Sequence, residues 1–127
     1  MLDRPEFYRF HQGQKTLPFA DAEYEARLGQ LRQLMIAESV DACLLTSMHN
    51  IAYYSGFLYC AFGRSYGLVV TASDTVTISA GIDAAQPWRR CYGDNITYTD
   101  WQQHNYWRAI LSVTGTNKVI GTEDDHL

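Results

Sequence analysis

Residues 66–80, YGLVVTASDTVTISA, decide the fold class of this chain. The runs 66–71 and 75–80 are rich in β-branched and apolar side chains, and residues 72–74 between them have the length of a hairpin turn. The stretch therefore predicts two antiparallel strands joined by a tight turn. Since helical patterns lie on both sides of it, the pair predicts a sheet of mixed strand direction.

A long helix is predicted upstream of the hairpin, from Asp21 to near Ser39. Apolar residues that recur every three or four positions share one face of it: Tyr24, Leu28, Leu31 and Met35, widened by Leu34 and Ala37. Asp21 is expected to cap this helix, because Ala20 stands where serine or threonine is preferred. Gly29 costs roughly 1 kcal/mol relative to alanine inside a helix, so we expect another element to pack closely there.

Strands and helices alternate along the rest of the chain. Short apolar runs predict strands at 42–46, 96–99 and 118–121, and helical patterns predict helices at 48–55, 82–89 and 107–113. Pro87 is expected to shorten the helix around it, and Asn105 to cap the last helix. The predicted architecture is a single layered α/β domain, with a mixed sheet flanked by helices.

The first 18 residues show no clear period and contain Pro5 and Pro18. We expect residues 1–18 to form an irregular N-terminal arm and residues 19–127 to form the domain. The total of 127 residues fits one domain with one hydrophobic core.

Composition excludes several classes of protein. Hydrophobic residues make up 46% and charged residues 19%, which excludes intrinsic disorder. The formal net charge of −4, without basic stripes, gives no footprint for nucleic acid. No apolar stretch is long enough to span a membrane, and the N-terminus lacks the pattern of a signal peptide. The protein is therefore expected to be cytoplasmic.

The usual signatures of catalysis and of metal binding are absent from the sequence. It contains no GxSxG, P-loop, GxGxxG or HExxH motif, and its histidines are scattered. Cys43, Cys60 and Cys91 form no CxxC pair, and reduced structural thiols are the favoured interpretation. No metal ion or cofactor is expected in this chain.

Residues 46–70, TSMHNIAYYSGFLYCAFGRSYGLVV, combine a predicted helix with many aromatic side chains. Phe57, Tyr53 and Tyr54 are interpreted as core aromatics. Phe62 and Arg64 differ because they flank a glycine, which permits a sharp turn. A planar guanidinium beside an aromatic ring suits a small carboxylate with an apolar or planar body. On this chemistry alone, carboxylate binding by Arg64 and an ordinary surface arginine both stay open, the second slightly ahead.

The same segment closely resembles the corresponding stretch of the creatinase family. The similarity resumes at 79–90 (SAGIDAAQPWRR), 98–107 (YTDWQQHNYW) and 121–127 (GTEDDHL), and it covers about Phe19 to the end. Several long blocks in the same order are more specific than one short motif. Creatinases share a wider fold family with prolidases and Xaa-Pro aminopeptidases. The resemblance implies a small N-terminal α/β domain that precedes a larger catalytic domain with the pita-bread fold.

For function, the resemblance implies hydrolysis of creatine to sarcosine and urea, without a metal, by acid–base chemistry of a histidine. The family's catalytic histidine and glutamates lie in the second domain, so this chain alone is expected to be inactive. In creatinases a Phe-Gly-Arg segment reaches the active site of the partner subunit in a homodimer. The resemblance implies that Phe62 packs on the substrate and Arg64 binds its carboxylate. The matching His49, Tyr59 and Trp88 are expected to be structural supports.

Two other functions stay open. The chain could be the N-terminal domain of an Xaa-Pro aminopeptidase or prolidase-type metallopeptidase, although such peptidases do not need the pair Phe62 and Arg64. It could also be a stand-alone binding or oligomerisation module. Within the first function, the substrate could be another guanidino or N-methyl amino acid.

Overall fold

The computed structural model describes residues 6–9, 11, 14–57, 65–81, 86–99, 104–116 and 118–123. The strands are β1 (Phe7–Arg9), β2 (Ala42–Leu45), β3 (Gly67–Thr71), β4 (Thr75–Ala80), β5 (Asp94–Tyr98) and β6 (Ile120–Thr122). The helices are α1 (Asp21–Ala37), α2 (Met48–Ser55), α3 (Gln86–Arg90) and α4 (Asn105–Thr114). None of the helices in these ranges is long and apolar enough to cross a bilayer.

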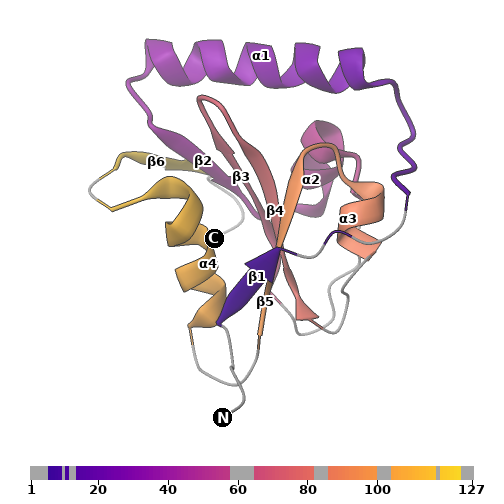
Figure 1. Ribbon diagram of the computed structural model, residues 1–127. Helices are drawn as coiled ribbons and strands as arrows, with labels where there is room; N and C mark the ends of the chain where they lie inside the picture. The colour runs from indigo at the N-terminus through magenta and orange to yellow at the C-terminus, as the bar shows by residue number, and fades with distance from the viewer. Residues whose placement is uncertain are drawn as a thin grey trace.

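The strands form one mixed sheet in the order β1-β5-β4-β3-β2-β6 (Figure 1). The predicted hairpin is present, since β3 and β4 pair antiparallel with Val69 opposite Val76. β2 pairs antiparallel with β3, whereas β4 with β5 and β2 with β6 are parallel pairs. The prediction of a mixed sheet is therefore confirmed.

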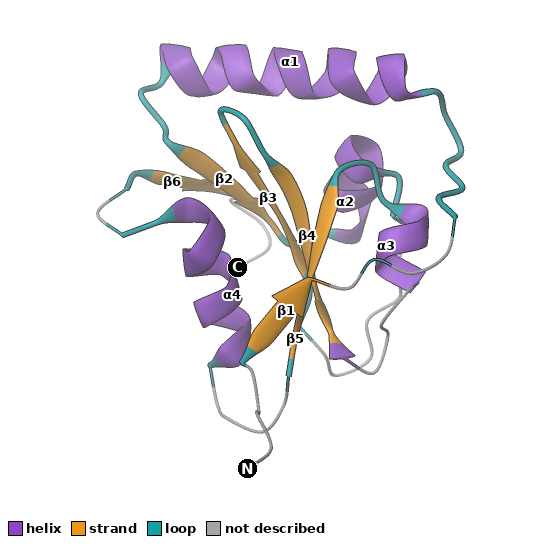
Figure 2. Cartoon of the chain, viewed as in Figure 1, coloured by secondary structure: helices purple, strands orange, loops and turns teal. Residues whose placement is uncertain are grey.

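Helices cover both faces of this sheet (Figure 2). Because side chains alternate along a strand, Val69 of β3 packs into the cluster that contains Tyr106 and Ile110 of α4. Its neighbours Leu68 and Val70 pack on the opposite face, in the cluster with residues of α1 and α2. Each face thus has its own apolar core, and the prediction of an α/β domain flanked by helices is confirmed.

α1 matches its predicted range but buries a narrower face than expected. Tyr24, Leu28 and Met35 are buried, as predicted from their spacing. Leu34 is 58% exposed, so the prediction that it widens the apolar face is wrong. The close packing predicted at Gly29 is also wrong, because nothing lies within 4 Å of a Cβ built there. α1 lies across one end of the sheet (Figure 1), and most of its side chains are exposed.

The predicted helix caps are also corrected. Ala20 occupies the N-cap position of α1 without a side-chain hydrogen bond, and Asp21 is the first helical residue. The N-cap of α4 is His104 in a left-handed conformation, so Asn105 does not cap the helix. The side-chain amide of Asn105 instead donates to the carbonyl oxygen of Thr99 over 3.0 Å and links the end of β5 to the start of α4.

The expectation of an irregular arm is wrong at Phe7–Arg9. These residues form β1, which pairs antiparallel with β5 at an edge of the sheet. A strand of three residues is too short to show a period, which explains why the sequence pattern missed it. The division into residues 1–18 and 19–127 stays a prediction.

Candidate functional site

The two substrate-binding residues predicted from the sequence, Phe62 and Arg64, lie outside the described residues, as does Tyr59. The structure describes the chain on both sides of them. On the N-terminal side, α2 leads to Gly56 and to the buried Phe57. On the C-terminal side, the chain is described again from residue 65 and enters β3 at Gly67.

Gly56 ends α2 in a conformation that requires glycine. Its φ of +81° is left-handed, and a Cβ built there would lie 2.5 Å from the hydroxyl oxygen of Tyr24. The Gly56 amide donates to the carbonyl oxygen of Ala52 and closes the last turn of α2. This combination fixes the direction in which the chain leaves the helix.

The flanking residues on both sides are held by the core. The Ser55 hydroxyl donates to the carbonyl oxygen of Ile51 over 2.5 Å and accepts from the Phe57 amide over 3.2 Å. The rings of Phe57 and Tyr66 contact each other edge to face at 6.3 Å between centroids. The Tyr98 hydroxyl donates to the carbonyl oxygen of Ser65 over 2.5 Å. The two ends of segment 58–64 therefore rest on one part of the core.

The beginning of α2 is held by Glu123, which directly follows β6. Its carboxylate accepts hydrogen bonds from the Thr46 amide, from the Ser47 amide over 2.9 Å, and from the Asn50 side chain over 2.5 Å. Burial alone would raise the pKa of Glu123, but the hydrogen bonds from Ser47, Thr46 and Asn50 lower it to about 2. The parallel pairing of β2 with β6 places Glu123 beside the start of α2.

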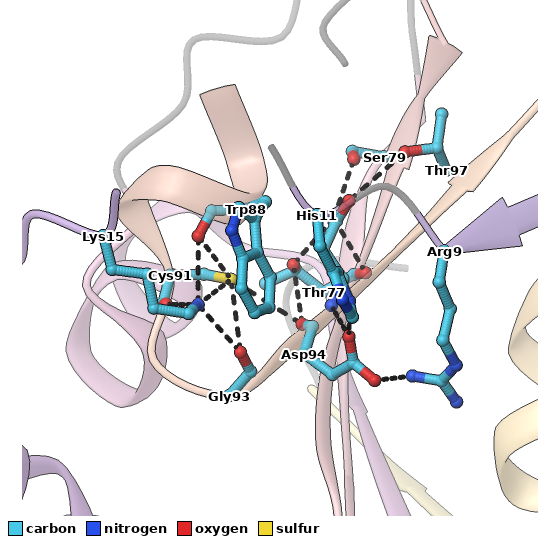
Figure 3. Close-up of polar contacts among 11 residues, drawn as sticks. Arg9, His11, Lys15, Thr77, Ser79, Trp88, Cys91, Gly93, Asp94 and Thr97 are labelled. Atoms are coloured by element: carbon cyan, nitrogen blue, oxygen red, sulfur yellow. Dashed lines mark hydrogen bonds and ion pairs between the residues drawn. The ribbon is translucent and has the colours of Figure 1, made fainter. Parts of the chain in front are cut away.

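A second polar cluster joins the N-terminal residues to α3 and β5 (Figure 3). The Lys15 ammonium donates to the carbonyl oxygens of Trp88, Cys91 and Gly93 over 3.0, 2.6 and 2.9 Å. It also lies 3.6 Å from the centroid of the Trp88 ring. Burial lowers the pKa of Lys15. These contacts make Lys15 an anchor of the N-terminal segment.

Asp94 links the same cluster to β1. Its carboxylate forms an ion pair with Arg9 and a contact of 2.5 Å with the His11 ring. The His11 ring in turn stacks on Trp88, with 3.9 Å between centroids. Trp88 therefore acts as a structural support, as expected from the sequence.

Cys91 lies in this cluster but is not placed for nucleophilic chemistry. Its side chain is fully buried, and burial raises the pKa of the thiol above its usual value despite the Lys15 ammonium 3.7 Å away. Burial also raises the pKa of Cys43. Both thiols agree with the interpretation as structural cysteines, while Cys60 lies outside the described residues.

The sheet beside Cys91 carries a row of buried polar side chains: Thr77, Ser79, Asn95 and Thr97. The Asn95 amide nitrogen lies 2.9 Å from the Thr77 hydroxyl and 3.0 Å from the Ser79 hydroxyl. The Thr97 hydroxyl donates to the Asn95 amide oxygen over 3.2 Å. Since these groups satisfy one another, the row stabilises the pairing of β4 with β5. Among the described residues, no group of three or more His, Cys, Asp or Glu is arranged to hold a metal ion.

The model of the Creatinase/Prolidase N-terminal domain family matches residues 27–127. The chain belongs to this family. The creatinase of Bacillus sp. (strain B-0618) is 45% identical to it over 120 residues. That match covers 91% of this chain and 29% of the creatinase. The resemblance to creatinases stated from the sequence blocks is confirmed.

Solved structures of peptidases share the fold. The N-terminal domain of an X-Pro dipeptidase from Streptococcus pyogenes superposes with a TM-score of 0.69 at 23% identity, over 80% of this chain and 79% of that one. The dipeptidase PepE from Mycobacterium ulcerans superposes with a TM-score of 0.73 at 15% identity, over 91% of this chain and 31% of that one. At these identities the likeness extends to the fold alone.

Sequence reasoning missed Lys15 and Glu123. Lys15 anchors the N-terminal segment to the end of α3, and Glu123 holds the start of α2. Both contact residues more than 70 positions away, so no local period marks them. Glu123 lies within a block that resembles creatinases, whereas Lys15 lies in the stretch where no structure was expected.

Proposed function

We propose that this chain is the N-terminal, non-catalytic domain of a creatinase-like hydrolase that converts creatine and water to sarcosine and urea. The observation that carries the proposal is the 45% identity to a creatinase over 120 residues. The match spans 29% of that creatinase, and in this proposal the catalytic groups belong to a further domain. The chain alone then has no hydrolase activity.

In this proposal the chain completes the active site of a partner subunit in a homodimer. Phe62 packs on the substrate, and Arg64 binds its carboxylate. A guanidinium can form two parallel hydrogen bonds with a carboxylate, a geometry that lysine cannot reproduce. The support from the described residues is indirect: both ends of segment 58–64 are tied to the rigid core through Gly56, Phe57 and Tyr66.

The gene that encodes the chain, extended to its natural stop codon, provides the test. We expect an open reading frame with a second domain, and a product that releases urea from creatine. The Arg64→Ala variant is expected to raise KM by at least tenfold, since a hydrogen bond to a charged group contributes about 1.5–3 kcal/mol. Arg64→Lys serves as the matched control, which keeps the charge and loses the paired hydrogen bonds. Unchanged kinetics in Arg64→Ala would remove Arg64 from the site.

The second candidate is the N-terminal domain of an Xaa-Pro peptidase. It is favoured by the family itself, whose description names prolidases beside creatinases. This function predicts cleavage of Xaa-Pro peptides that manganese or cobalt stimulates, and no release of urea from creatine. A reading frame without a second domain would leave a stand-alone binding module as the function.

A further inference from the structure

A cleft of about 540 Å³ lies between the N-terminal segment, the end of α2 and α3. The described residues that line it are Gln14, Thr16, Leu17, Pro18, Gly56, Arg89 and Arg90. Its volume falls in the range of about 300–1,000 Å³ that is typical of sites for small molecules. The described lining contains two arginines and no acidic side chain, although the whole chain has a net charge of −4.

The walls of this cleft are fixed before any ligand arrives. The Lys15 ammonium pins one wall to the end of α3 through the carbonyl oxygens of Trp88, Cys91 and Gly93. The Thr16 amide adds a hydrogen bond of 2.7 Å to the carbonyl oxygen of Arg89. Gly56 lines the cleft at the end of α2, where its amide donates a hydrogen bond to the carbonyl oxygen of Ala52. Binding of a ligand in this cleft therefore requires little further ordering of the protein, so the entropic cost of binding is small.

The two arginines are not used by the fold. Basic side chains in the last turn of a helix commonly bind its terminal carbonyl groups. In α3 these carbonyl groups are bound by other residues. The Lys15 ammonium donates to the carbonyl oxygen of Trp88, and the Thr16 amide donates to that of Arg89. Within the part of the chain that the structure describes, the guanidinium groups of Arg89 and Arg90 have neither an ion pair nor a hydrogen bond.

We propose that this cleft binds the oxyanion group of a small molecule, a carboxylate or a phosphate, through Arg89 and Arg90. Guanidinium groups bind both kinds of oxyanion with paired, charge-assisted hydrogen bonds. Leu17 and Pro18 provide an apolar wall for the body of the ligand, and the side chain of Gln14 adds a further hydrogen-bonding group. The site is independent of the function proposed for Phe62 and Arg64.

A titration of the 127-residue chain, followed by ¹H–¹⁵N NMR, tests this proposal. Sodium phosphate and sodium acetate are the two probes, and sodium chloride at equal ionic strength is the reference. We expect saturable shifts of the Thr16 and Gly56 amides with at least one probe and none with chloride. The probe that binds more tightly then identifies the oxyanion that the cleft prefers.

Substitutions locate the binding. The double variant Arg89→Ala, Arg90→Ala is expected to weaken the apparent affinity by about tenfold or more, from the loss of charge-assisted hydrogen bonds. The double variant Arg89→Lys, Arg90→Lys keeps both charges and should give an intermediate affinity. Lys118→Ala, which removes a positive charge next to the edge strand β6, is the control and should leave the affinity unchanged, because Lys118 does not line the cleft.

The proposal is overturned if chloride reproduces the shifts, if neither probe gives saturable shifts, or if the double alanine variant binds as the wild type does. Both arginines are exposed, so the variants should keep the fold, which the dispersion of the same spectra verifies. Urea release by the extended protein is a separate measurement, so the two proposals fail independently.

Discussion

Glu123 shows how one carboxylate joins parts of the chain that are far apart in sequence. It accepts hydrogen bonds from two backbone amides and one side-chain amide at the start of α2. A negative charge at this end of a helix is also favoured by the helix dipole. Its pKa of about 2 therefore describes a carboxylate that the folded state holds in its ionised form.

This pKa predicts a loss of stability in acid. Because the folded pKa lies below the 4.5 of an unperturbed glutamate, the unfolded chain binds the proton more tightly. The contribution of Glu123 is complete above pH 4.5 and is lost as the pH falls toward 2. In urea unfolding, the stability difference between wild type and Glu123→Gln should shrink across this window. A difference that is constant with pH would contradict the prediction.

At the scale of single elements, two glycines on helices have opposite meanings. Gly29 lies within α1 with open space around its Cα, whereas Gly56 ends α2 with a left-handed φ against the Tyr24 hydroxyl. The sequence alone assigned close packing to Gly29, because a glycine inside a helix suggests a neighbour. The contact is instead at Gly56, where the chain turns toward the predicted substrate-binding segment.

Alanine at these two positions should therefore have opposite effects. Gly56→Ala is expected to destabilise the chain by at least about 1–2 kcal/mol, the cost of a left-handed conformation with a side chain. Gly29→Ala should stabilise it by about 0.5–1 kcal/mol, because alanine favours the helix and meets nothing. Chemical denaturation of both variants checks this pair. A neutral Gly56→Ala would show that α2 can end in another way.

Local signals were sufficient to predict most elements. The range predicted for α2 matches 48–55, and that for β4 matches 75–80, because turn residues bound both runs. The predicted helix at 82–89 is described only from Gln86, with Pro87 in its first turn, where a missing amide costs nothing. The caps were assigned wrongly, since they depend on contacts such as that of Asn105 with Thr99.

At the scale of the whole molecule, the sequence was sufficient to predict the layered α/β fold but not the long-range contacts of its N-terminal residues. The pairing of β1 with β5 and the anchoring by Lys15 each join residues more than 70 positions apart. No period or motif within one stretch can report such contacts. For the same reason, the cleft beside Arg89 and Arg90 was not anticipated. The roles of Phe62 and Arg64 stay predictions that rest on the resemblance to creatinases.

Lys15 is expected to matter for the stability of the entire domain. Lys15→Met keeps the aliphatic chain but leaves the carbonyl oxygens of Trp88, Cys91 and Gly93 without their donor. We expect a loss of about 1.5–3 kcal/mol in the free energy of unfolding, with faster hydrogen exchange at the Thr16 amide. Lys118→Met, at an exposed lysine, is the matched control. Equal stability of the two variants would mean that water replaces the ammonium without cost.

The strand order also determines the sequence in which the strands can pair during synthesis. β2, β3 and β4 are neighbours in sequence and can pair as soon as they leave the ribosome. β1 can pair only after β5 has been synthesised, and the free edge of β2 only after β6, so β1 pairs late although it precedes the other five described strands. During synthesis β4 and β2 are therefore edge strands with unpaired backbone groups. They stay so until β5 and β6, which are synthesised later, pair with them.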